Sequence, residues 1–315
     1  MGTVMNYRYL LAFLTTILIP GIANAQNVVA LYTPSLDFQD GVARNQFVSQ
    51  VAKILTDSTG QAWEGKAFAR ASDFESSLSS TSVAILDADY FTAKSNGLQP
   101  VAMLASNGSN KRAMKVIVRK GGSDKLYAYR NQRFSLVSAS PYGAAFLTAS
   151  ALDHEIKAND YFSSLTDAHN IRSSINAVAM GNADLTMAFD GYDSGFTTVY
   201  TTPAVGLPVI AVNTSKITGK QLESVKSVLQ NLPVKTSIIT GSTRYDASAA
   251  SAYQKLAQSK KSASLTYQPA EPENIRFKTS NLSLPAGKTG IPMNPGLVEF
   301  APSLTELDKR LERRL

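Results

Sequence analysis

Two serines stand where a predicted strand gives way to a predicted helix, and their hydroxyl groups could hold an anion. Ser138 and Ser140 lie in the stretch VSASPYG at residues 137–143, which ends the apolar run 134–138. Hydroxyl donors and the free N–H groups of a helix N-terminus both suit an oxyanion. Pro141 has no N–H to donate, although proline fits the first turn of a helix. The two serines could equally cap the helix, so both interpretations stay open.

Carboxylates and a tyrosine follow a second apolar run. Asp87, Asp89 and Tyr90 come directly after the predicted strand 83–86. The carboxylates would repel a phosphate unless they accept hydrogen bonds from its protonated oxygens or meet an amine on the ligand. Carboxylates are also common in turns that bind nothing.

Three further residues lie at the ends of predicted elements, where ligands of open α/β sheets bind. Asp190 follows the apolar run 185–189, at a position expected for a hinge or a pocket. Tyr142 stands at a helix start, and with Tyr90 it is expected to form a pocket wall. Tyr32 follows the first predicted strand, 28–31, and joins the candidates.

Residues suited to catalysis or metal binding are few. The chain has two histidines, His154 and His169, and no cysteine. It contains no Gly-x-Ser-x-Gly nucleophile elbow and no His-x-x-x-His pair. A triad of Ser140, His169 and Asp190 can be written down, but neither chain order nor loop context supports it. We therefore expect no enzyme, no cofactor and no metal site.

Alternating apolar runs and helical patterns predict the elements that position these residues. The expected strands are 28–31, 83–86, 98–104, 115–119, 134–138, 185–189, 199–204 and 207–212, with an extended segment at 60–68 and a loop at 159–166. The expected helices are 41–56, 74–80, 139–151, one around Ile175 that stops at Gly181, 219–229 and 248–257. This order predicts an α/β fold of two lobes, each a doubly wound, mainly parallel sheet. The helices 219–229 and 248–257 are expected to pack on the first lobe.

The first residues have the pattern of a secretory signal peptide. An apolar run at 9–19 follows Arg8 and precedes Ala23-Asn24-Ala25, which resembles a cleavage site. Cleavage after Ala25 would place the mature protein in the periplasm. No later stretch is apolar enough to span a membrane.

Charge adds little. The formal net charge is +7, from 31 basic and 24 acidic residues, and the basic residues are spread along the chain. This mild excess of basic residues is only weak evidence for an anionic ligand or surface. No nucleic-acid-binding motif accompanies it, so nucleic acid is not an expected partner.

The order of three motifs resembles a known family. FSLVSASPYG at 134–143, NDYF at 159–162 and AVAMGNAD at 177–184 are similar to the phosphate/phosphite/phosphonate-binding proteins of ABC importers, which have the type II periplasmic binding fold. DADY at 87–90 also resembles the first-lobe loop of that family. The resemblance covers about residues 28–232 and rests on the order and spacing of loose motifs.

This resemblance implies a binding site between the two lobes. The family's anion turn is Gly-Ser-Thr-Ser-Gly-like, whereas residues 137–143 lack the leading glycine. His169, Asn170 or Arg172 would take the place of the family's ligand-facing histidine. The candidate ligand-binding residues are Tyr32, Tyr90, Ser138, Ser140, Tyr142, Gly143, His169, Arg172 and Asp190.

The C-terminal stretch departs from a plain transport receptor. Residues 263–315 are rich in proline and glycine, and they end in a predicted amphipathic helix that opens with the capping box at 303–306. The helix would dock on its own lobe or on a partner protein. The expected organisation is a signal peptide at 1–25, lobe 1 at 26–118, lobe 2 at 119–205, a return to lobe 1 at 206–262, and this tail.

Two functions follow from these observations. The first is a periplasmic solute-binding protein that captures a small phosphate- or phosphonate-like anion for the permease of an ABC importer. The second is a binding-fold protein that no longer transports and acts as a sensor or interaction module through its tail.

Overall fold

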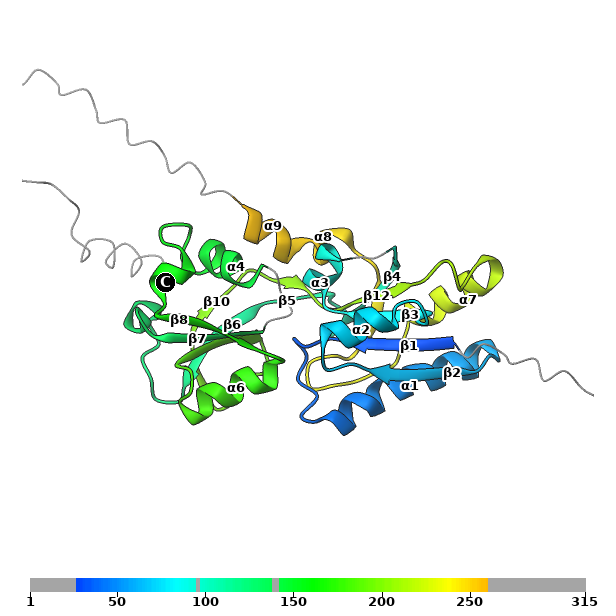
Figure 1. Cartoon of the computed structure of the whole chain (residues 1–315), viewed down its shortest axis with the longest axis horizontal. Coiled ribbons are helices and arrows are strands. Elements are labelled where there is room, and N and C mark those ends of the chain that lie inside the picture. The colour runs from blue at the N-terminus through cyan, green and yellow to red at the C-terminus, as the bar shows by residue number, and fades with distance from the viewer. Residues whose placement is uncertain (1–26, 95–96, 138–141, 260–315) are drawn as a thin grey trace, which may run out of the picture.

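The chain forms two α/β lobes that lie side by side. The computed structural model describes residues 27–94, 97–137 and 142–259. The two large sheets form separate lobes, and helices α8 and α9 lie along their common edge (Figure 1). Within these residues no helix is both long and apolar enough to cross a bilayer. The expected signal peptide and tail lie outside the described residues and remain predictions.

Lobe 1 is built on a six-stranded sheet with the order β13-β4-β12-β3-β1-β2. Its strands are β1 (Asn27–Tyr32), β2 (Trp63–Ala67), β3 (Val83–Leu86), β4 (Gln99–Ala105), β12 (Val209–Val212) and β13 (Gly241–Arg244). Its helices are α1 (Gly41–Thr59), α2 (Ala71–Ser77), α3 (Ala88–Ala93) and α7 (Gly219–Leu229).

Lobe 2 is built on a five-stranded sheet with the order β10-β6-β9-β7-β8. Its strands are β6 (Met114–Arg119), β7 (Arg133–Val137), β8 (Ser164–Ala168), β9 (Leu185–Phe189) and β10 (Phe196–Thr201). Its helices are the 3-10 turn η1 (Leu126–Tyr129), α4 (Gly143–Ser150), α5 (Ala158–Tyr161) and α6 (Ile171–Met180).

Helix α1 shows how local signals set these elements. The Asp40 carboxylate accepts a hydrogen bond from the Ala43 N–H at 2.7 Å and caps the helix, and Gly60 ends it in the left-handed conformation. The apolar face from Phe47 to Leu55 is buried against the sheet. Gly65 of β2 runs so close to α1 that an added Cβ would lie 2.6 Å from a backbone oxygen.

The two lobes confirm the predicted fold class, but the sheets are mixed instead of mainly parallel. In lobe 1, β1 pairs in parallel with β2 and β3, whereas β12 and β13 pair antiparallel with their neighbours. In lobe 2, β7 is parallel to β8 and β9, whereas β6 and β10 are antiparallel. The antiparallel pairings follow from strands that carry the chain out of one lobe and back again.

The chain crosses between the lobes through a small third sheet. Strands β5 (Lys111–Arg112) and β11 (Val205–Gly206) pair antiparallel and link β4 to β6 and β10 to β12. Strand β6 belongs to lobe 2. The chain therefore passes from lobe 1 to lobe 2 before residue 114, earlier than the boundary expected at 118. An apolar strand pattern such as 115–119 does not show which of the two sheets the strand joins.

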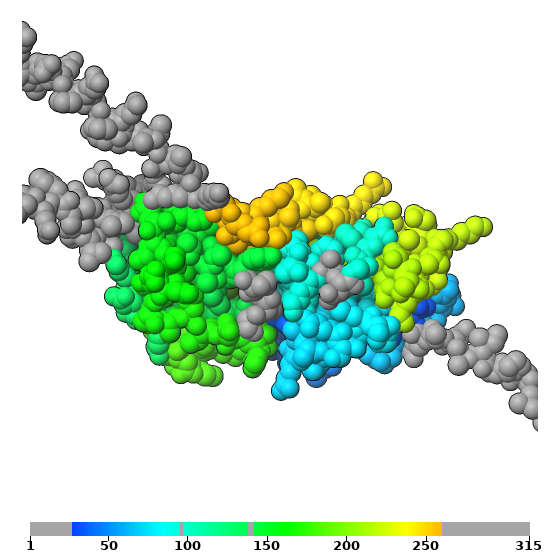
Figure 2. Space-filling model, turned by 45° about the horizontal axis from the view of Figure 1, so that its top comes forward, coloured from blue at the N-terminus to red at the C-terminus, as the bar shows by residue number. Residues whose placement is uncertain are grey.

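The last described helix returns to lobe 2, contrary to the sequence-based expectation. Helices α8 (Ala247–Ala250) and α9 (Ala252–Gln258) follow β13, and α9 packs mainly on α4. Tyr253 stacks on Phe146 of α4 with a centroid distance of 4.0 Å. Figure 2 shows this orange and yellow segment laid across both lobes. Aromatic stacking between helices distant in sequence leaves no periodic signal, so the pattern alone could not assign α9 to lobe 2.

The expected loop at 159–166 is instead a short helix and a strand. Tyr161 in α5 is buried and its hydroxyl donates to the Leu126 carbonyl at 3.0 Å. Phe162 packs on Phe134 with a centroid distance of 4.8 Å. Strand β8 is an edge strand with polar residues, so its alternation is weak in the sequence.

Candidate ligand site between the lobes

A cavity of about 50 Å³ lies between the two lobes. It is lined by Ser35, Asp87, Ala88, Asp89, Met114, Leu136, Val137, Gly143, Ile171, Met187, Phe189, Val205, Gly206 and Tyr253. Several of these residues stand at or just beyond the carboxyl ends of β1, β3, β7 and β9, where open α/β sheets bind ligands. Both lobes and the crossing strands contribute to its wall.

The polar side of the cavity belongs to lobe 1. The Asp87 carboxylate accepts two hydrogen bonds from Ser35, from the N–H at 2.9 Å and from the hydroxyl at 2.6 Å. Asp87 is only 4% exposed, and Asp89 stands two residues later in the first turn of α3. Burial and the Asp89 charge raise the pKa of Asp87 to about 8, against the hydrogen bonds from Ser35. Near neutral pH this carboxyl group therefore carries a proton for much of the time.

The opposite wall is apolar and comes mainly from lobe 2. Its buried side chains come from β7, α6 and β9, and they are Leu136, Ile171, Met187 and Phe189. Gly206 of the crossing strand β11 completes the wall next to α8. An added Cβ there would lie 2.5 Å from the Ala249 carbonyl oxygen, so this close approach needs glycine.

Direct bonds join the lobes at the rim of the cavity. The loop after β1 carries Asp37, whose carboxylate pairs with Arg172 of α6 at 2.7 Å. The Asp37 N–H donates to the Tyr192 hydroxyl at 3.0 Å, and the Ile171 N–H donates to the Pro34 carbonyl at 2.8 Å. The first turn of α6 and the loop after β9 are thus attached to lobe 1.

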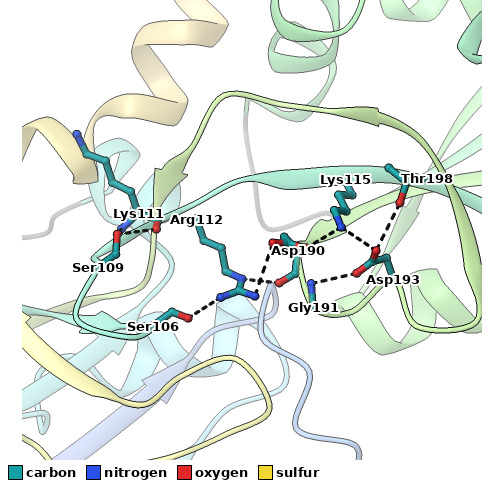
Figure 3. A network of polar contacts seen from close by, with 9 residues as sticks. All are labelled: Ser106, Ser109, Lys111, Arg112, Lys115, Asp190, Gly191, Asp193 and Thr198. Carbon is teal, nitrogen blue, oxygen red and sulfur yellow. Dashed lines mark hydrogen bonds and ion pairs between the residues drawn. The ribbon is translucent and has the colours of Figure 1, made fainter. Parts of the chain in front are cut away.

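A polar network braces the crossing strands (Figure 3). Arg112 of β5 donates through Nε to the Asp190 carbonyl and through a terminal nitrogen to the Ser106 hydroxyl at 2.5 Å. Lys115 of β6 bridges the carboxylates of Asp190 and Asp193 at 2.7 and 2.8 Å. These bonds raise the pKa of Lys115. Arg112 therefore ties the end of β4 in lobe 1 to the end of β9 in lobe 2.

Two predicted pocket tyrosines lie behind the cavity wall. Tyr32 and Tyr90 are buried at 4% and 3% exposure and pack edge to face with centroids 5.1 Å apart. Tyr32 also stacks on Phe74, and the Tyr90 hydroxyl donates to Glu75 at 2.6 Å. Neither tyrosine lines the cavity, because the apolar packing of lobe 1 takes up both rings.

Of the other candidates, Gly143 lines the cavity and four lie around or away from it. Tyr142 precedes α4, and its hydroxyl accepts a hydrogen bond from the Gln254 amide at 3.0 Å. His169 is exposed, and Asn170, not His169, caps α6 by accepting from the Ser173 N–H. Arg172 pairs with Asp37 at the rim of the cavity, and Asp190 belongs to the polar network that braces the crossing strands. Ser138 and Ser140 lie outside the described residues, so their role stays a prediction.

The cavity also contains residues that sequence reasoning did not select. Ser35 follows a predicted strand and a proline, a position that the strand-end rule could have found. Phe189 and Val137 end buried strands and could have been found in the same way. Gly206 and Tyr253 carry no such signal, because their place depends on how α8 and α9 pack. Among the described residues no group of three or more His, Cys, Asp or Glu side chains could hold a metal ion.

Comparisons place the fold among known structures. No protein-family model and no curated protein matches the sequence. A binding protein component of an ABC phosphonate transporter from Pseudomonas aeruginosa superposes with a TM-score of 0.59 at 10% identity, over 73% of this chain and 85% of that one. PhnD1 from Prochlorococcus marinus, in complex with methylphosphonate, gives 0.59 at 11% identity over 74% and 97%.

A third solved structure has the same arrangement. XAC2383 from Xanthomonas citri, bound to ATP, gives a TM-score of 0.52 at 14% identity over 74% of this chain and 96% of that one. Identities this low establish the architecture alone. The chain has the two-lobed α/β fold of the binding proteins of ABC transporters.

Proposed function

We propose that the chain is a periplasmic solute-binding protein that holds a small ligand between its lobes and delivers it to an ABC importer. The cavity between the lobes carries this proposal, since strand ends of both lobes and the crossing strands line it. The two crossing strands and the polar network around Arg112 would form the hinge about which the lobes open. No catalytic step is assigned to the site, and the export step rests on the predicted signal peptide.

The finer proposal of a phosphate- or phosphonate-like anion rests on the serine turn and on the fold neighbours. One neighbour is a component of a phosphonate transporter and another is in complex with methylphosphonate. An oxyanion would meet the hydroxyls of Ser138 and Ser140, which precede α4 in the sequence. It would also face Asp87, which in its protonated form can donate a hydrogen bond.

A solute screen with a matched pair of variants tests the binding function. Phosphate, phosphite, methylphosphonate, organic anions, amines and amino acids would be screened by thermal shift. A true ligand at 100 times its dissociation constant stabilises the protein by about 2.7 kcal/mol. Hits would be measured by calorimetry on the wild type and on Gly143→Val, which adds a branched side chain beside Leu136 in the cavity.

Gly41→Val is the control, because Gly41 also begins a helix but lies on the surface away from the cavity. We expect Gly143→Val to weaken binding at least tenfold and Gly41→Val to leave it unchanged. A screen without any hit, or a hit that both variants bind like the wild type, would refute solute binding in this cavity.

A further inference from the structure

A second and larger hollow lies on lobe 1, outside the cavity between the lobes. This side cleft has a volume of about 270 Å³ and is formed by the loop after β1, one side of α1 and the segment 235–237. Its described lining residues are all different from those of the cavity between the lobes. One water molecule needs only about 10–15 Å³ of such volume. The side cleft therefore has room for a molecule, and not only for a single small ion.

The side cleft is lined by side-chain amides, hydroxyls and an ammonium group. These polar residues are Gln39, Gln46, Gln50, Lys235, Thr236 and Ser237. Gln46 and Gln50 stand four positions apart on α1, so their amides lie on the same side of the helix. Among the residues that the structure describes, the side chains of Gln46, Gln50 and Lys235 form no hydrogen bond or ion pair. All three are therefore available to a ligand.

The charge of the side cleft is that of Lys235. Asp37 also lines the cleft, but its carboxylate is already paired with Arg172 at 2.7 Å. The remaining polar groups are neutral, and a side-chain amide can both donate and accept hydrogen bonds. The side cleft thus suits a ligand that carries one negative charge and several hydroxyl groups.

The walls of the side cleft are held in place by packing and by a tight turn. Phe38 and Phe47 contribute an apolar surface, and their rings lie 5.3 Å apart between centroids. In the segment 235–237, the Thr236 N–H donates to the Ile239 carbonyl at 2.9 Å, and the Ile239 N–H donates to the Thr236 hydroxyl at 3.1 Å. The Ile239 side chain is buried. Walls that are already ordered reduce the entropy lost on binding.

We propose that the side cleft binds a polyhydroxylated carboxylate of monosaccharide size, with its carboxylate at Lys235 and its hydroxyls at Gln46 and Gln50. An apolar solute would take water from the two amides without replacing their hydrogen bonds. An ammonium compound would be repelled by Lys235. This second site goes beyond the proposed transport function and does not depend on which ligand the cavity between the lobes holds.

Three sugars of matched shape test the chemistry of the side cleft. D-Glucuronate, D-glucose and D-glucosamine share one ring and carry a carboxylate, no charge and an ammonium group. Each would be titrated into the full chain at about pH 6, where the carboxylate is ionised and the amine is protonated. Amide chemical shifts in NMR spectra at Gln50 and Ser237 report on the side cleft, and those at Ser35 and Gly206 report on the cavity between the lobes.

We expect glucuronate to bind in the side cleft at least about threefold more tightly than glucose, and glucosamine to bind more weakly than glucose. Lys235→Gln should remove this order, and Gln50→Ala should weaken the binding of all three sugars. The controls are Lys53→Gln and Asn45→Ala, which change an exposed cation and an exposed amide of α1 outside the side cleft. Both controls should bind the three sugars like the wild type.

Several outcomes would overturn this second site. They are an absence of shifts at Gln50 and Ser237 with all three sugars, equal binding of glucuronate and glucose, and an unchanged order of affinities in Lys235→Gln. Shifts confined to Ser35 and Gly206 would place the sugar in the cavity between the lobes. That result would overturn the side cleft as a binding site and leave the solute-binding function intact.

Discussion

Arg172 of lobe 2 makes a two-pronged ion pair with Asp37 of lobe 1. Nε lies 2.9 Å from Oδ1 and a terminal nitrogen 2.7 Å from Oδ2. The Asp37 side chain is 10% exposed and the Arg172 side chain 42% exposed, so the carboxylate is the buried partner. A planar guanidinium that meets both oxygens fixes the orientation of the two groups as well as their distance. Arg172 was predicted as a ligand contact, and in the structure it joins the two lobes through this ion pair.

Arg172→Ala is expected to favour the open arrangement of the lobes. The variant leaves a largely buried carboxylate without its cation in the closed form, which we expect to cost about 1–2 kcal/mol, discounted for the exposure of the arginine. Opening lets water solvate Asp37. Small-angle X-ray scattering of the full chain should then show a larger radius of gyration than the wild type.

Arg133→Ala is the matched control, because Arg133 makes a similar two-pronged pair with Asp184 within lobe 2. Its loss should leave the radius of gyration unchanged. Equal scattering of Arg172→Ala and the wild type would show that the rim pair does not hold the lobes together.

Arg112→Lys is expected to destabilise the hinge. A single ammonium cannot reach both the Asp190 carbonyl and the Ser106 hydroxyl in the fork geometry of a guanidinium. We expect the free energy of unfolding to fall by about 1–3 kcal/mol in urea denaturation. The neighbouring Lys111→Gln, which loses an exposed bond to Ser248, should change it by less than about 0.5 kcal/mol. Similar losses in both variants would argue against a brace at Arg112.

Much of the architecture could be predicted because its elements carry local signals. Helix α7 occupies the predicted range 219–229, and α6 ends at Gly181, where a left-handed cap was expected. The buried strands β3 and β9 also match short apolar runs between turn residues. Such signals fix each element, and the order of elements then limits the possible folds.

The candidate site was predicted less well, because it depends on packing between distant segments. Tyr32 and Tyr90 stand at element ends, as pocket residues do, but their rings are used in the core of lobe 1. Tyr253 reaches the cavity only because α9 returns to lobe 2. The pairing of Asp37 with Arg172 joins residues 135 positions apart, and no spacing rule shows it.

Gly206→Ala is expected to disturb the crossing strands beside the cavity. The added Cβ would lie 2.5 Å from the Ala249 oxygen and 2.8 Å from its carbonyl carbon, so β11 and α8 must move apart. We expect a loss of about 1–3 kcal/mol in the free energy of unfolding, measured in urea. Gly41→Ala, whose Cβ would meet nothing closer than 4.0 Å, should be neutral or slightly stabilising. A neutral Gly206→Ala would contradict the close packing of α8 on β11.

Asp87 is expected to make stability fall as the pH rises from about 4 to about 8. Its pKa is raised from 3.8 to about 8 by burial and Asp89, so between these values the folded state holds a proton that the unfolded state has released. The stabilisation is complete below the unfolded pKa and is lost as the pH rises through the folded pKa, by at most about 1.4 kcal/mol per pH unit. Asp87→Asn cannot titrate, so its stability relative to the wild type should rise across this window in urea denaturation at each pH.

Two further variants test whether this pH dependence belongs to Asp87. Asp73→Asn should follow the wild-type profile, since Asp73 is exposed. Ser35→Ala removes the hydroxyl bond that favours the charged carboxylate, so it should move the upper end of the window to higher pH. Parallel profiles for the wild type and Asp87→Asn would show that Asp87 ionises in the folded protein as it does in the unfolded chain. A shift with Ser35→Ala, in contrast, would show that the hydroxyl of lobe 1 sets the charge of the cavity wall.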